Sequence, residues 1–390
     1  MLEKSMCGRW IIAGLIMVSP PSLAAQAVPE LRLTRDLRID AAEHDLTFIT
    51  PPGGMAVSTS GVIVFSQNQD GVLRFFDARG ASLGTFGRKG QGPGEFQIAA
   101  RLSWIAGTLV VSDGTTRRFT LVSPDRKLIR TVPWLANVSV PGKAGEGPRV
   151  RASIPRSSYA DGSQLMTVSL ATGSPVPEWP GGEKPGIPLI RVDSTGAFQR
   201  LIAWSPRRDC SVPFDAGAGM GSGTLMTPFC AQAIEDVSPD GSRISLAFLE
   251  PGSTPAFRVT AFRASGDTIY SRSYPFQPVS IPSGVKDSAR AARARGSQSQ
   301  RDAAAKMPIP DSYPPVSRVL VGRDETTWLE VYGAKGERVW QVLDARGSVI
   351  GRIGAPPPNT HFMVVSRDAV WAIETDGDGL QHVVRFRVGR

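Results

Sequence analysis

The stretch MAVSTSGVIVFSQNQDGVLRFFDARGASLGTF, residues 55–86, contains four short apolar segments separated by three tight turns. The turns lie at residues 59–61, 69–71 and 77–80, and each contains a glycine, which can adopt the positive φ that such turns need. β-Branched and aromatic residues fill the segments between the turns. The stretch therefore predicts one antiparallel sheet of four strands, at residues 55–58, 62–66, 72–76 and 82–86.

This unit recurs along the chain, as expected for a repeat architecture. Its first turn occurs six times, at Gly61, Gly107, Gly162, Gly241, near Asp324 and near Asp368. Its third turn occurs five times, at residues 77–80, 124–126, 193–196, 264–266 and 344–347. Six four-stranded units predict an all-β chain that folds as a six-bladed β-propeller over residues 28–390.

The missing copy of the third turn indicates how the ring closes. The sequence ends at Arg390, just after the third strand of the last unit at residues 382–388, so this unit lacks an outer strand of its own. A spare strand is available at residues 31–39, where the alternation of apolar and polar residues slips around Arg35 and Asp36. We expect this N-terminal strand to complete the last blade, with a β-bulge at the slip, and to cover an exposed edge.

Residues 1–27 have the features of a secretory signal, with a positive start, an apolar stretch and a small-residue cleavage site at residues 25–27. We predict a mature protein that begins near Val28 and resides in the periplasm or outside the cell; an uncleaved anchor is the alternative. No later segment is long and apolar enough to span a membrane. Once Cys7 is removed, only Cys210 and Cys230 remain, and an oxidising compartment favours a disulfide between them over two free thiols.

The formal net charge of the chain is +9 at pH 7. A basic surface can attract anionic partners, but arginines scattered without interleaved aromatic residues do not fit single-stranded nucleic acid. We therefore interpret the charge as a contribution to solubility. No nucleic-acid partner is expected, and the protein is expected to be a monomer.

Residues 87–96, GRKGQGPGEF, join the first unit to the second. Four glycines and a proline suit a linker that returns the chain from the outer edge of one blade to the ring centre. We expect Phe96 to pack between blades and Glu95 to accept hydrogen bonds from backbone N–H groups. The segment resembles the inter-blade linker of NHL-type repeats, and residues 109–113, 117–119 and 123–127 resemble the core of that repeat.

A second resemblance lies further along the chain. Residues 237–248 resemble the Ser-Pro-Asp-Gly turn of WD40-like and TolB-like blades. The chain from about residue 30 to residue 390 is similar to exported bacterial six-bladed β-propellers. This resemblance implies the same fold as the turn pattern does.

Three segments exceed a minimal blade: residues 173–188 around Trp179, residues 205–229 with the two cysteines, and residues 283–312. Alanine and arginine in the last predict two short helices between blades 4 and 5, at residues 286–295 and 300–307. The candidate binding residues are Trp179 and three arginines that could form an anion-attracting rim, Arg290, Arg293 and Arg295. The alternative, which we favour, is a solvated excursion that covers apolar surface.

No catalytic residue is predicted. The three histidines, His44, His361 and His382, show no metal-ligand spacing. Glu374, Asp376 and Asp378 could bind Ca²⁺, but they lack the remaining ligands of a calcium loop, and a turn at the end of a strand explains them more simply. No cofactor is expected, with Ca²⁺ as the one candidate.

Two functions are consistent with these observations. The leading hypothesis is an exported propeller that acts as a binding scaffold for a protein, peptide or carbohydrate on the face that carries the insertions. The alternative is a metal-assisted hydrolase or lyase. This alternative rests on similarity to propeller lactonases, in which residues from several blades hold Ca²⁺ or Zn²⁺ on the central axis.

Overall fold

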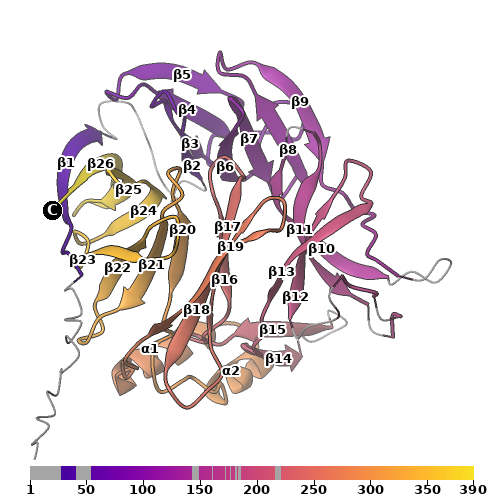
Figure 1. Cartoon of the computed structure of the whole chain (residues 1–390), viewed down its shortest axis with the longest axis vertical. Coiled ribbons are helices and arrows are strands. Elements are labelled where there is room, and N and C mark those ends of the chain that lie inside the picture. The colour runs from indigo at the N-terminus through magenta and orange to yellow at the C-terminus, as the bar shows by residue number, and fades with distance from the viewer. Residues whose placement is uncertain are drawn as a thin grey trace, which may run out of the picture.

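The computed structural model describes residues 28–40, 54–142, 149–159, 161–171, 173–175, 177–180, 182, 186–215 and 221–390. It contains six four-stranded antiparallel sheets, the blades, arranged in a ring (Figure 1). The prediction of a six-bladed β-propeller is confirmed. The signal predicted at residues 1–27 lies outside the described residues.

Each blade is a meander that starts near the ring axis. Blade 1 consists of β2 (Met55–Val57), β3 (Ile63–Gln67), β4 (Val72–Phe76) and β5 (Ser82–Phe86). Blade 2 consists of β6 (Ala99–Ile105), β7 (Thr108–Asp113), β8 (Arg118–Val122) and β9 (Leu128–Pro133). Blade 3 consists of β10 (Val150–Ser158), β11 (Gln164–Leu170), β12 (Ile187–Val192) and β13 (Phe198–Ser205).

The second half of the ring repeats this order. Blade 4 consists of β16 (Ile234–Val237), β17 (Arg243–Leu249), β18 (Ala256–Arg263) and β19 (Thr268–Pro275). Blade 5 consists of β20 (Arg318–Val321), β21 (Thr327–Tyr332), β22 (Arg338–Leu343) and β23 (Val349–Ile353). Blade 6 consists of β24 (Thr360–Val365), β25 (Ala369–Thr375), β26 (Gln381–Gly389) and β1 (Arg32–Ile39).

The apolar core lies between neighbouring blades, because alternate residues of each strand face opposite sides of its sheet. Between blades 5 and 6, Trp328 and Trp340 are fully buried, and Trp340 stacks on Phe362 with ring centroids 5.0 Å apart. Between blades 1 and 2, the linker residue Phe96 is 1% exposed and joins the apolar cluster of both blades, as predicted.

The ring closes through β1, which pairs antiparallel with β26 in blade 6. Its register shifts between Arg35 and Leu37, so the predicted bulge is confirmed. Just before β1, the N-terminal segment runs along the outer strand of blade 5: the N–H of Leu31 donates to the carbonyl of Arg352 at 2.6 Å, and the N–H of Arg352 donates to the carbonyl of Pro29 at 2.9 Å. The N-terminal segment therefore ties blade 5 to blade 6.

The linker at residues 87–96 is held by two side chains of blade 2. Asp113 is fully buried and accepts hydrogen bonds from four backbone N–H groups, those of Gln97, Ile98, Thr115 and Thr116. Arg118 donates to three linker carbonyls, those of Gln91, Gly92 and Glu95. Within the linker, the carboxylate of Glu95 accepts the N–H of Gly92 at 2.7 Å, as predicted. The segment is thus a structural clamp between two blades.

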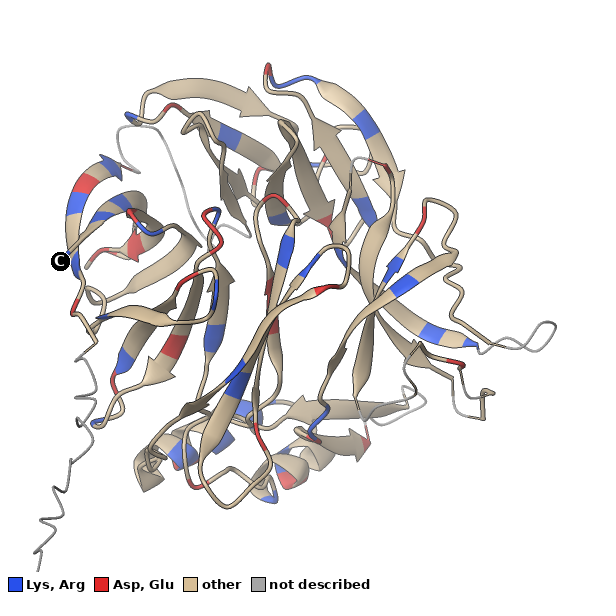
Figure 2. Cartoon of the chain, in the orientation of Figure 1, with Lys and Arg blue, Asp and Glu red and all other residues tan. Residues whose placement is uncertain are grey.

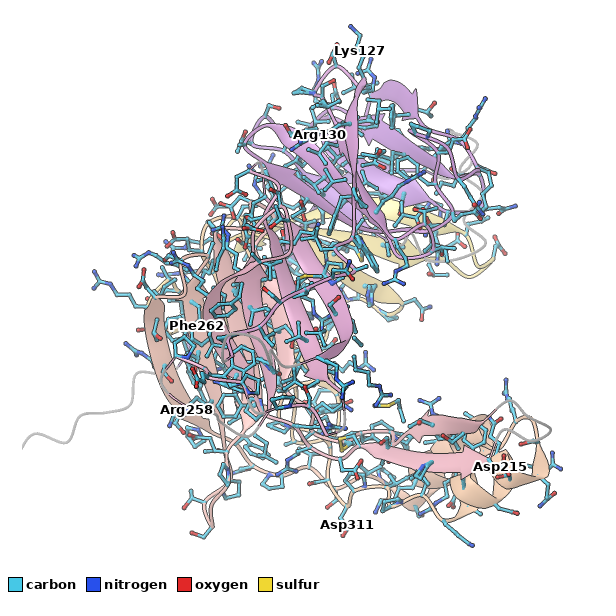
Figure 3. The ribbon with its side chains drawn as sticks, turned by 90° about the vertical axis from the view of Figure 1, so that its right-hand side faces the viewer. Lys127, Arg130, Asp215, Arg258, Phe262 and Asp311 are labelled. Atoms are coloured by element: carbon cyan, nitrogen blue, oxygen red, sulfur yellow. A yellow bond between two sulfur atoms is a disulfide. The ribbon has the colours of Figure 1, made fainter. Side chains whose placement is uncertain are left out.

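Two insertions leave the ring beside blade 4 and fold together into what we call the arm. The first, between blades 3 and 4, contains the hairpin β14 (Ser211–Asp215) and β15 (Ser222–Met226). The second, between blades 4 and 5, contains the helices α1 (Ser283–Arg293) and α2 (Gln298–Ala305). Figure 3 shows the hairpin and the helices projecting from the ring as one unit, with Asp215 and Asp311 labelled on it.

The helices confirm the predicted insertion, but each begins two or three residues earlier than predicted. Pro282 precedes α1 directly, and the hydroxyl of Ser297 accepts the N–H of Gln300 at the start of α2. These N-terminal signals matter more than the alanine content on which the prediction relied. None of the helices in the described ranges is both long and apolar enough to cross a membrane.

The arm has its own apolar cluster, built from both insertions: Val212, Phe214, Leu225, Phe229, Ala289, Ala294, Ala303, Ala304, Met307 and Ile309. A disulfide joins Cys210 to Cys230 across the base of the hairpin, which confirms the predicted pairing. At the other insertion, the N–H of Tyr313 donates to the carbonyl of Val279 at 2.9 Å and that of Ile281 to the carbonyl of Asp311 at 2.8 Å. These bonds form a short neck between blade 5 and the helices.

Candidate functional site

A cavity of about 1180 Å³ lies where the neck of the arm meets blade 5. One wall is the chain that enters and leaves the helices, residues 275–282 and 313–315. Another is blade 5 itself, from the end of β21 through the turn at residues 333–337 to β22 and β23. Val28 and Glu30 of the N-terminal segment complete the lining. We call this space the arm-base cavity.

The aromatic part of the lining is a pair of stacked tyrosines. The rings of Tyr313 and Tyr332 lie 4.1 Å apart at an interplanar angle of 12°. Phe229, from the disulfide-bonded insertion, packs edge-on against Tyr313 at 5.3 Å. The stack therefore links blade 5 to both insertions. Burial raises the pKa of Tyr332, so its hydroxyl stays protonated and can donate a hydrogen bond at neutral pH.

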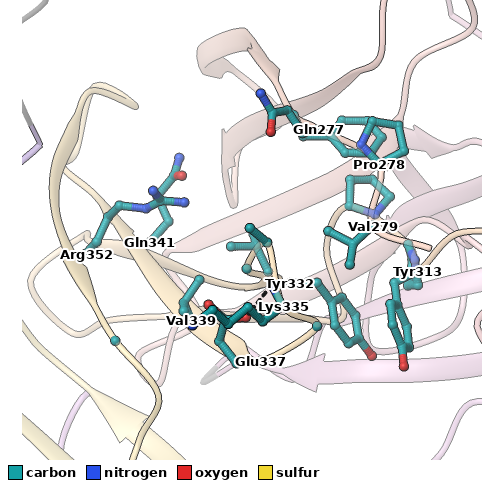
Figure 4. A pocket seen from close by; sticks show the side chains of 18 of the residues that line it. Gln277, Pro278, Val279, Tyr313, Tyr332, Lys335, Glu337, Val339, Gln341 and Arg352 are labelled. Carbon is teal, nitrogen blue, oxygen red and sulfur yellow. Dashed lines mark hydrogen bonds between the residues drawn. The ribbon is translucent and has the colours of Figure 1, made fainter. Parts of the chain in front are cut away.

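Polar side chains line the opposite end of the cavity. Figure 4 shows the two tyrosines at one end, Gln341 and Arg352 at the other, and Gln277 above. The carboxylate of Glu337 lies between them and accepts the N–H of Lys335 at 2.9 Å. An aromatic wall with amide, guanidinium and carboxylate groups around it can bind a ligand that has both apolar and polar parts.

The three predicted rim arginines lie on or just after α1, but they do not form one free cationic patch. Arg290 pairs with Asp287 at 3.3 Å on an exposed face. Arg293 donates to the carbonyl of Met226 at 3.3 Å and so joins α1 to β15. Arg295 is exposed. Figure 2 shows positive and negative side chains interspersed over the ring and the arm, in keeping with the interpretation of the charge as solubility.

Trp179, the fourth candidate binding residue, lies in blade 3, away from the arm-base cavity. Its side chain is 5% exposed and packs edge-on against Trp204 at 5.4 Å and Phe198 at 6.1 Å. The structure thus places its ring in the core of blade 3, and we do not include it in the proposed site.

The acidic residues near the end of the chain occupy the turn between β25 and β26. Asp376 accepts the N–H groups of Asp378 and Leu380 and shares a hydrogen bond with His382 at 2.9 Å. The bond with His382, together with those backbone bonds, lowers the pKa of Asp376. Glu374 instead pairs with Arg35 of the closing strand. Within the described ranges, no group of three metal-ligating side chains is found.

Sequence reasoning missed Tyr313 and Tyr332. The available signal was weak: the chain has only five tyrosines, and one of these two precedes a pair of prolines at the end of the longest excursion. Gln277 and Arg352 carried no signal, because their proximity depends on the packing of the neck against blade 5.

No known family profile matches the sequence, and no curated protein matches it. Among solved structures, the fold is similar to that of a DUF4221 family member from Bacteroides vulgatus, at 13% identity over 93% of this chain and 99% of the other, with a TM-score of 0.49. It is also similar to a Bacteroides fragilis protein described as exported, at 12% identity over 92% and 95% with a TM-score of 0.45.

A third similar structure is virginiamycin B lyase from Staphylococcus aureus, at 10% identity over 92% of this chain and 99% of the other, with a TM-score of 0.39. At these identities the likeness is one of fold. The fold and the site define a six-bladed β-propeller with a cavity at the base of a two-part arm. The resemblance to NHL-type repeats and TolB-like blades stays a prediction.

Proposed function

We propose that this protein is a binding propeller that holds an extended peptide segment of a partner in the arm-base cavity. The observation that carries the proposal is the cavity itself, with the Tyr313–Tyr332 stack at one end and Gln341 and Arg352 at the other. A binding site with one aromatic anchor and a few convergent polar groups is typical of recognition without chemistry.

Two features favour a peptide over a compact small molecule. The volume of about 1180 Å³ exceeds the range of roughly 300–1,000 Å³ that small-molecule sites occupy. One wall already holds an extended segment of polypeptide, since residues 29–31 hydrogen-bond to the edge of β23. The same edge chemistry would suit a second extended chain.

We place this activity outside the cytoplasm, in the periplasm or in the medium. The secretory signal predicted at residues 1–27 supports this location, and so does the disulfide between Cys210 and Cys230, since such bonds persist in oxidising compartments.

Arrays of peptides and of glycans, probed with the purified mature protein, would test the proposal. We expect peptide hits, and we expect Tyr332→Ala to weaken the best hit by about 10-fold or more, because it removes the aromatic anchor. Tyr332→Phe keeps the stack and serves as the matched control. Hits that are only glycans, or peptide binding that survives Tyr332→Ala, would contradict the proposal.

Two further measurements address the other hypotheses. Replacing Arg290, Arg293 and Arg295 by glutamate should leave peptide affinity within about 2-fold, because these side chains do not line the cavity; a larger loss would restore the anion-attracting rim. Metal analysis of the purified protein tests the hydrolase or lyase alternative, which a stoichiometric, tightly held metal would favour.

A further inference from the structure

The first strands of the blades bring charged side chains from several blades to the ring axis. Arg101 comes from β6, Arg156 from β10, Glu235 and Asp236 from β16, and Arg318 from β20. Two of these strands, β16 and β20, follow directly after the two insertions, so the group lies on the side of the ring from which the arm departs.

Three carboxylates in this region each have an arginine partner. Arg156 pairs with Glu235 at 2.8 Å, between blades 3 and 4. Arg101 pairs with Asp236 at 3.6 Å, and this bond joins blade 2 to blade 4. Arg338 pairs with Glu330 at 3.7 Å within blade 5.

Each of these carboxylates is also supported by other groups or is well shielded from solvent. The second oxygen of Asp236 accepts the N–H of Val321 at 2.9 Å. The hydroxyl of Ser317 donates to Glu330 at 2.7 Å. The side chain of Glu235 is 14% exposed. None of the three is therefore available as a full partner for a further cation.

Arg318 is the cation left over. Its nearest opposite charges are Glu330 and Asp236, yet it makes no ion pair and no hydrogen bond within the described residues. Burial lowers the pKa of Arg318, although the two carboxylates oppose this effect. A guanidinium nonetheless stays protonated at neutral pH. A partly desolvated charge without a hydrogen-bonded partner is unfavourable and rarely kept without a use.

The neighbouring strand adds a polar group without a second charge. His361 of β24 is near enough for the charge of Arg318 to act on it, and partial burial together with that charge lowers the pKa of His361. Its imidazole is therefore neutral at pH 7 and can donate one N–H bond. Burial raises the pKa of Asp236, and any protonation of Asp236 adds to the positive excess.

We propose that Arg318, with His361 beside it, binds the carboxylate of a small molecule at the axis of the ring. The planar guanidinium matches a carboxylate through two parallel hydrogen bonds. A single negative charge balances the one unpaired cation, whereas a dianion would be repelled by the three nearby carboxylates. This site is independent of the arm-base cavity, whose lining includes neither Arg318 nor His361.

Calorimetric titration with straight-chain monocarboxylates from acetate to decanoate, with their primary amides and with inorganic phosphate, tests the inference. We expect at least one carboxylate to bind and its amide to bind at least 10-fold more weakly. Arg318→Gln should weaken that carboxylate at least 10-fold, while Arg346→Gln, an exposed arginine in a turn of the same blade, should leave it unchanged. Absence of carboxylate binding, preference for phosphate, or equal binding by Arg318→Gln would overturn the inference.

A stability measurement separates a ligand site from a structural role. Arg318→Met keeps the volume of the side chain and removes the unpaired charge. If Arg318 awaits a ligand, this variant should melt at the same temperature as the native protein or higher, because an unfavourable group has been removed. A fall in melting temperature, with carboxylate affinity retained, would assign Arg318 to the scaffold and overturn the inference.

Discussion

The carboxylate of Asp36 binds the guanidinium of Arg385 through two hydrogen bonds, Oδ1 to Nε at 2.8 Å and Oδ2 to Nη2 at 3.1 Å. Arg387 adds a third at 2.6 Å, to Oδ2. Asp36 is the residue at the bulge of β1, and both arginines belong to β26. The bulge therefore places one carboxylate between two cations exactly where the first and last strands of the propeller meet.

Replacing Asp36 by asparagine should weaken this closure. The substitution keeps the size of the side chain but removes the charge that both arginines share, so we expect a loss of about 1.5–3 kcal/mol in the free energy of unfolding. Chemical denaturation monitored by fluorescence gives this value. Asp287→Asn removes an exposed helix pair and should change stability by less than about 0.5 kcal/mol. Equal effects of the two substitutions would refute the closure role.

The same pair predicts a dependence on pH. Burial raises the pKa of Asp36, but hydrogen bonds from Arg385 and Arg387 outweigh it and the net pKa is lowered. A carboxylate with a lowered pKa stabilises the fold above its unfolded pKa of about 3.9, and this contribution is lost as pH falls through the folded pKa. The stability difference between native protein and Asp36→Asn should thus be constant from about pH 5 to 8 and shrink below about pH 4. A difference that persists at pH 3 would contradict it.

Deleting residues 28–40 should destabilise the whole ring, because it exposes the edge of β26 and removes Ile39, which is 1% exposed, from the core between blades 6 and 1. We expect the melting temperature to fall by more than roughly 10 °C. Attaching residues 31–39 behind Arg390 through a copy of the 77–80 turn should restore most of it. Unchanged melting after deletion, or no recovery after relocation, would argue against closure by this strand.

The features that the sequence predicted well are local or countable. Glycine and aspartate mark each turn within four residues, so six first turns and five third turns could be counted, and Cys210 and Cys230 had no other cysteine to pair with after signal removal. The arm could not be foreseen, since its cluster joins Phe214 and Leu225 to Ala304 across more than 75 residues. The unpaired state of Arg318 likewise depends on distances between blades, which no turn signal encodes.

Asp113 should be among the most sensitive polar residues of the ring. Asp113→Ala leaves four backbone N–H groups without their acceptor, and we expect a loss of at least about 2 kcal/mol in the free energy of unfolding. Asp125→Ala, in an exposed turn of the same blade, should cost less than about 0.5 kcal/mol. If denaturation midpoints of the two variants coincide, the linker at residues 87–96 is not held as described.

The disulfide should stabilise the arm and leave the ring unaffected. Cys210 and Cys230 enclose the hairpin over a separation of 20 residues, and closing a loop of that size contributes about 3 kcal/mol. Replacing both by alanine should speed hydrogen exchange in β14, β15 and α2, because these elements share one apolar cluster, while exchange in β3 and β4 stays slow. Adding a reductant should reproduce this pattern in the native protein and have no effect on the double variant. Two free thiols in protein purified without reductant would show that the bond does not form, and the exchange pattern would then need another cause.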